Sequence, residues 1–146
     1  MRFNYAFQKI VDLKNNERTQ AEWILSQAIG QLQTEQGHLA HLHTAREEMQ
    51  DQLMSVSASK ATISEIMLLQ QYVEHIDTKI VEKNRHVKQA EEVVVDKQGH
   101  LTDKMLEEKV WVKAKEKAHG HFTARLLQKE QQELDEMATN RFQRTF

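Results

Sequence analysis

The fold is decided by residues 21–56, AEWILSQAIGQLQTEQGHLAHLHTAREEMQDQLMSV. Apolar side chains recur in this stretch in alternating steps of four and three residues, and Glu35 and Arg46 interrupt them. A repeat of about 3.5 residues keeps one apolar seam of a helix turned toward a partner helix, as in a coiled coil. We therefore predict a seam through Leu25, Leu32, Leu39, Leu42 and Leu53.

The seam stops at residues 55–62, SVSASKAT, where small and hydroxyl-bearing residues favour a turn over a helix interior. Thr62 and Glu65 have the spacing of a capping box, which predicts that a second helix begins here. Apolar positions in this second helix again recur every three and four residues. Its seam runs through Ile66, Val73, Ile76, Ile80, Val87 and Val94.

The predicted fold is all-α, with two long helices forming an antiparallel coiled-coil hairpin, because a short loop makes consecutive amphipathic helices antiparallel neighbours. We expect the first helix over about residues 3–56, the loop over 57–62 and the second helix over 63–141. Together they form a single domain over residues 1–146, and no proline interrupts it. The second helix is longer and overhangs the first beyond about Glu116.

Folding the chain at the loop aligns the two seams in one register, which places Leu39 opposite Ile80. The same register places Glu35 opposite Lys83. We predict an ion pair there that fixes the register, because misalignment would bury a lone charge. Arg46 has no such partner across the seam, and we expect its head group to reach solvent. Since the seams complement each other within one chain, the free protein is predicted to be a monomer.

Apolar side chains continue into the overhang, where the chain offers no partner helix. A single helix cannot bury such a stripe against itself, so the segment either frays or docks on another molecule. The aromatic residues Phe3 and Phe7 leave a similar choice between ordinary packing and exposed anchors for a partner. The apolar residues of the overhang are Phe122, Leu126, Met137 and Phe142.

The composition excludes several classes of function. There is no cysteine, and His38 and His41, with His75 predicted across from them, lack the further ligands of a closed zinc shell. A two-helix hairpin offers no cavity for catalysis, so we expect no enzyme, cofactor or metal. The net charge of −2 argues against nucleic acid. No apolar run approaches the roughly 20 residues that span a bilayer, so a cytosolic protein is expected.

Three strings in the sequence are informative together: FNYAFQKIVDLK at residues 3–14, LQQYV at 69–73 and EQQELDEMA at 130–138. In this order and spacing they resemble the FliJ family of flagellar export proteins. The resemblance implies a cytoplasmic protein at the flagellar base, peripheral to the membrane through its partners. It implies a stalk-like adaptor that links the hexameric ring of the export ATPase FliI to the export gate FlhA and assists export of flagellar proteins. FliH and export chaperones are further implied partners.

In that family the terminal end of the hairpin enters the ATPase ring and the second helix contacts the gate. Carried over, the ring-binding residues are Phe3, Phe7, Phe122, Arg125, Leu126, Lys129, Met137 and Phe142. The gate-binding residues are Tyr72, Ile76, Lys79 and Lys83. Lys83 therefore has two competing assignments, the register and the gate. The alternative function is that of a generic cytosolic coiled-coil scaffold or chaperone.

Overall fold

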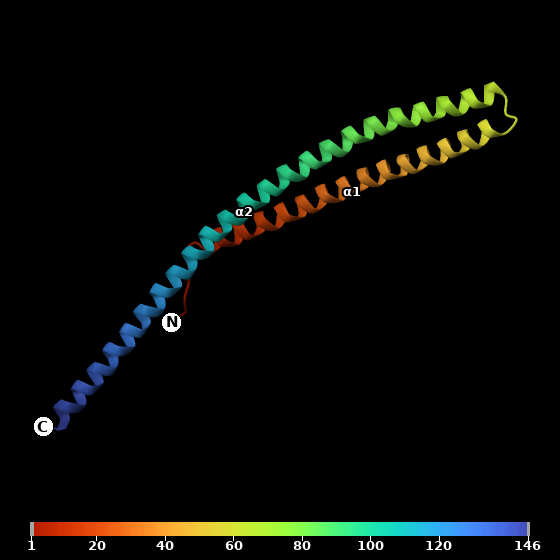
Figure 1. Cartoon of the computed structure of the whole chain (residues 1–146). Coiled ribbons are helices and arrows are strands. Elements are labelled where there is room, and N and C mark those ends of the chain that lie inside the picture. Colours follow the sequence, from red (N-terminus) through yellow and green to blue (C-terminus); the bar gives the residue numbers. More distant parts are fainter. Residues whose placement is uncertain (1, 146) are drawn as a thin grey trace. The chain divides into compact units, whose positions relative to one another are not determined.

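The chain contains two long helices. The computed structural model describes residues 2–145, with side chains described through residue 143. Helix α1 spans Gln8–Ala58 and helix α2 spans Ile63–Thr145, and a loop at residues 59–62 joins them (Figure 1). No strand occurs within residues 2–145. The predicted all-α hairpin with a longer second helix is confirmed.

The start of α1 differs from the sequence-based prediction, because α1 begins at Gln8 and not near Phe3. Residues 2–5 are not helical, and the backbone N–H of Gln8 donates to the carbonyl of Tyr5 at 3.1 Å. The aromatic residues of this segment pack on α2, as described below. This packing competes with continuation of the helix.

The turn between the helices is built by hydroxyl side chains. Ser57 Oγ donates to the carbonyl of Leu53 at 2.7 Å, near the last turn of α1. The backbone N–H of Glu65 donates to Thr62 Oγ1 at 3.3 Å, so Thr62 caps the start of α2. The bond from Glu65 satisfies one of the backbone N–H groups that the start of a helix leaves without an intrahelical partner. The serine-rich run thus ends one helix and starts the next.

Residues 2–145 form two compact units. The loop-proximal unit is residues 21–101, and the terminal unit is residues 2–20 together with 102–145. In the loop-proximal unit α1 and α2 pack along the seams, and Ile76 and Ile80 are buried. The predicted seam residues Leu25, Leu32, Leu39, Leu42, Leu53, Ile66, Val73, Val87 and Val94 are all half-buried.

Two charged positions within the seam have partners. Lys83 Nζ donates to Glu35 Oε2 at 2.8 Å, which is the ion pair expected from the register. Arg46 forms an ion pair with Asp77, so the expectation that Arg46 lacks a partner is wrong. Asp77 directly follows the buried Ile76 and therefore flanks the seam. The predicted register aligned only the seam residues themselves, so it did not include Asp77.

Candidate partner-binding surfaces

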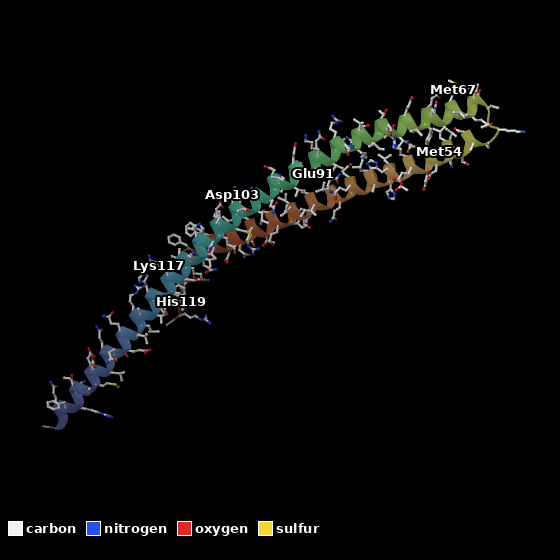
Figure 2. All side chains as sticks on the ribbon, in the orientation of Figure 1. Met54, Met67, Glu91, Asp103, Lys117 and His119 are labelled. Atoms are coloured by element: carbon white, nitrogen blue, oxygen red, sulfur yellow. The ribbon has the colours of Figure 1, made fainter. Side chains whose placement is uncertain are left out.

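An aromatic cluster in the terminal unit joins the N-terminal segment to α2. The ring of Phe3 lies 4.8 Å from that of His119 in an edge-on arrangement. It also lies 5.4 Å from the ring of Phe122. His119 is labelled on α2 in Figure 2. These contacts bring together Phe3 and Phe122, two residues that were predicted to bind the ATPase ring and that lie far apart in the sequence.

The cluster continues toward the start of α1. Tyr5 lies between its aromatic neighbours, with its ring 6.4 Å from Phe3 and 5.7 Å from Phe7. The ring of Phe7 is 5.9 Å from that of Trp111 on α2. Aromatic pairs at these separations stabilise packing beyond their buried area by about 0.5–1.5 kcal/mol each. Residues 3–7 therefore contact α2 through the rings of Phe3 and Phe7.

These contacts correct the predicted start of the overhang. Helix α2 was expected to lack an intrachain partner beyond Glu116, yet Phe3 packs on His119 and Phe122. The reason is that the N-terminal segment leaves the helix axis and covers further turns of α2. Leu126 is also half-buried, and the exposed stretch begins only after it.

The terminal segment of α2, residues 127–143, is exposed at every position. Four large apolar side chains stand out in it: Leu127 is 61%, Leu134 60%, Met137 65% and Phe142 66% exposed. A shallow groove lies where this segment begins. It is lined by four residues that were predicted to bind the ATPase ring: Phe122, Arg125, Leu126 and Lys129. The terminal unit thus presents apolar side chains beside cationic ones on one helix.

A network of ion pairs joins α1 and α2 in the terminal unit. Lys14 Nζ donates to Glu107 Oε2 at 3.2 Å, and Lys104 Nζ donates to Glu17 Oε2 at 3.3 Å. The bond from Lys14 lowers the pKa of Glu107, with the charges of Lys104 and Lys14 acting in the same direction. The same bond raises the pKa of Lys14. Arg18 also pairs with Glu108.

The predicted register ends at Val94, so these pairs were not predicted. Continued past that point, the register would place Lys14 opposite Met105 and Glu17 opposite Thr102. The structure instead pairs Lys14 with Glu107 and Glu17 with Lys104.

The predicted gate-binding residues divide into two that are exposed and two that are buried or half-buried. Tyr72 is 52% exposed and Lys79 is exposed. Ile76 is only 5% exposed because it packs in the seam, and Lys83 is held by Glu35. A partner that approaches the intact hairpin therefore meets Tyr72 and Lys79 first.

Beside these residues a shallow groove runs along the seam of the loop-proximal unit. Two of its histidines, His38 and His41, were not expected to bind metal, and the described residues contain no cluster of three or more potential ligands. Within residues 2–145 no helix combines the length and the apolarity needed to cross a membrane. The groove is lined by His38, His41, Leu42, Ala45, Lys79, Glu82, Lys83 and His86.

Comparison with known proteins gives the class of this two-helix protein. The family described as Flagellar FliJ protein matches residues 3–145. The Flagellar FliJ protein of Bacillus subtilis (strain 168) is 25% identical over 142 residues, which cover 97% of each chain. A solved structure from Chlamydia trachomatis, described as a YscO homolog, has a TM-score of 0.44 and 19% identity, covering 97% of this chain and 96% of that one.

The chain therefore belongs to the FliJ family. It is a coiled-coil protein related to flagellar type III export. The members of this family are export components without enzymatic activity.

Proposed function

We propose that this protein is a stalk-like adaptor of the flagellar export apparatus that links the ring of the export ATPase FliI to the export gate FlhA. It performs no chemistry itself and assists export through binding alone. It is a cytoplasmic monomer when free, and its partners hold it at the cytoplasmic face of the membrane at the flagellar base. FliH and export chaperones are further partners.

The exposed apolar residues on the terminal segment of α2 carry this proposal. Leu134, Met137 and Phe142 remain exposed in the chain by itself. Their burial against another molecule would be favourable by roughly 25 cal/mol for each Å² of apolar surface removed from water. Lys129 lies at the start of the segment and Arg125 just before it, and both cations suit a partner surface with acidic residues. We assign this segment and the aromatic cluster to the ATPase ring.

The gate is assigned to the loop-proximal unit. Tyr72 offers an exposed aromatic ring, and aromatic side chains are enriched among residues that dominate binding energy. Lys79 lies two helical turns further along α2 and supplies an accessible charge. Ile76 supports this surface from below by packing in the seam.

A pull-down with purified partners tests the proposal. The full chain should retain both the export ATPase and the cytosolic domain of the export gate. Combining Tyr72→Ala with Lys79→Ala should weaken retention of the gate and leave retention of the ATPase unchanged. Val81→Ala, at another exposed position of α2, serves as the control. Retention of neither partner would favour the alternative, a generic cytosolic scaffold or chaperone.

A further inference from the structure

An exposed row of lysines runs along α2 in the terminal unit. Lys109, Lys113 and Lys117 recur at intervals of four residues, so they lie on one side of the helix, about 6 Å apart along its axis. Leu106 and Val110 lie on the same side by their spacing and are 58% and 66% exposed. We call these five residues the lysine stripe, of which Lys117 is labelled in Figure 2.

The lysine stripe differs from the side of α2 that meets α1. On that side Lys104 pairs with Glu17, and Glu107 pairs with Lys14. By contrast, no lysine of the stripe forms an ion pair with another side chain of residues 2–143. The cations between the helices are thus balanced within the chain, whereas those of the stripe face solvent without a carboxylate partner.

The fixed charges around the stripe do not cancel. Residues 109–129 contain six lysine and arginine residues and one carboxylate, that of Glu116. Asp103 is exposed one turn before Leu106, at the end of the stripe away from Lys117. Lysine and arginine are protonated throughout the neutral pH range, so this positive charge does not depend on titration. The stripe is therefore suited to an anionic partner.

The spacing of the stripe indicates which kind of anionic partner fits. Recognition of an anionic bilayer typically uses clusters of about four to eight cations, whereas the stripe offers three lysines. A helix can present carboxylates at the same four-residue interval, and helices pack through rows of side chains four residues apart. Aliphatic side chains beside those carboxylates would pack on Leu106 and Val110 and remove apolar surface from water.

We propose that the lysine stripe binds an acidic amphipathic helix of another protein. The carboxylates of that helix pair with Lys109, Lys113 and Lys117, and its aliphatic side chains pack on Leu106 and Val110. Charge complementarity selects the partner, and the apolar contacts add affinity. The inference goes beyond the proposed function, because none of these five residues belongs to the surfaces assigned to the ATPase ring or to the gate.

The test uses the full chain and a synthetic, fluorescently labelled peptide of about 20 residues, a length sufficient for a stable helix. The peptide carries glutamate at every fourth position, a parallel row of leucines, and alanine elsewhere. Fluorescence anisotropy measures its Kd. We expect saturable binding that weakens as salt is added, since salt screens exposed charges. Failure of this peptide to bind, or equal binding by its glutamine counterpart, would overturn the inference.

Variants locate the binding on the stripe. The chain carrying Lys109→Gln, Lys113→Gln and Lys117→Gln should bind the acidic peptide about tenfold more weakly or worse, because three ion pairs are lost. Circular dichroism should show unchanged helicity, since all three positions are exposed. Replacing Leu106 and Val110 by serine should also weaken binding while leaving the charge unchanged.

A control removes the same charge from exposed lysines elsewhere and should bind the peptide as the unaltered chain does. It carries Lys9→Gln, Lys60→Gln and Lys88→Gln. Equal weakening in both triple variants would mean that net charge, and not the stripe, governs binding, which contradicts the inference. Conversely, glutamate in place of the three stripe lysines should transfer the preference of the chain to the lysine counterpart of the peptide.

Sedimentation with vesicles of phosphatidylserine and phosphatidylcholine tests the lipid alternative. Vesicle binding that requires the three lysines, together with no binding of the acidic peptide, would assign the stripe to a lipid surface and refute the acidic-helix proposal. The peptide experiment contains neither the ATPase nor the gate. If the peptide binds through the stripe while the pull-down retains neither partner, the proposed function fails and this inference stands.

Discussion

The ring of Phe3 lies 5.4 Å from the ring of Phe122, so the non-helical start of the chain covers part of α2 in the terminal unit. The contact joins residues that are far apart in sequence, and Phe7 makes a second such contact with Trp111 at 5.9 Å. Two of the residues assigned to the ATPase ring are thus already packed on each other in the free chain.

The first prediction concerns this aromatic contact. Phe3→Ala and Phe122→Ala should each loosen residues 2–7, and a double-mutant cycle should give a coupling energy of about 0.5–1.5 kcal/mol. Fluorescence of Trp111 during urea titration reports the loosening, because Phe7 packs on it. The measurement is made in a Trp23→Phe background so that Trp111 is the only source of signal. Strictly additive effects of the two substitutions would mean that the rings do not interact in solution.

The second prediction concerns the terminal segment of α2. Leu134→Asp combined with Met137→Asp should weaken binding of the export ATPase by about tenfold or more, because both side chains are exposed and are assigned to the interface. The thermal melt should hardly change, since exposed substitutions usually alter stability by less than about 0.5 kcal/mol.

A control with the same added charge on the same segment carries Gln128→Asp and Gln132→Asp at exposed polar positions. It should bind the ATPase better than the Leu134 and Met137 variant. Equal binding by both variants would show that charge, and not the apolar side chains, governs the contact. A large drop in the melting temperature would show that the segment packs within the chain.

The third prediction tests the seam. Leu39→Asp should destabilise the loop-proximal unit, since a buried leucine contributes about 1.5–3 kcal/mol and a charge in its place must be desolvated. Leu39 is half-buried, so we expect a loss near the lower value. Circular-dichroism melts measure it, with Glu47→Gln on the exposed face as the control. Coinciding melts of the two variants would mean that the seam lies elsewhere.

The fourth prediction follows from the lowered pKa of Glu35. A carboxyl whose folded pKa lies below its ordinary value of 4.5 stabilises the fold fully above that value. The stabilisation is lost as the pH falls through the folded pKa. Glu35→Gln should therefore lower the melting temperature at neutral pH, and the difference from the unaltered chain should vanish once the pH falls below the folded pKa.

Glu48→Gln, at an exposed position of α1, should produce no comparable difference. The exchange of both partners, Glu35→Lys with Lys83→Glu, should restore much of the stability at neutral pH because the ion pair can form again. A Glu35→Gln melt that matches the unaltered chain at every pH would show that the pair contributes nothing measurable.

The sequence by itself determined the fold class, because the repeat of apolar residues is a local property of each helix. Two seams of the same period on either side of one turn leave few ways to bury them. The ion pair between Glu35 and Lys83 followed from the same register, since both residues occupy seam positions. Thr62 was likewise identifiable as a cap from its spacing to Glu65.

Only the tertiary structure decided what lies outside the seam. Phe3 leaves the helix and packs on Phe122, an arrangement that depends on contacts across most of the chain and not on a periodic pattern. Asp77 meets Arg46 because long side chains reach around the seam, which a face-to-face alignment does not represent. The groove along the seam of the loop-proximal unit arises in the same way, because His38 of α1 and His86 of α2 line one surface only when both helices are in place. Periodicity fixes which residues face inward, whereas flanking side chains are positioned by the geometry between the helices.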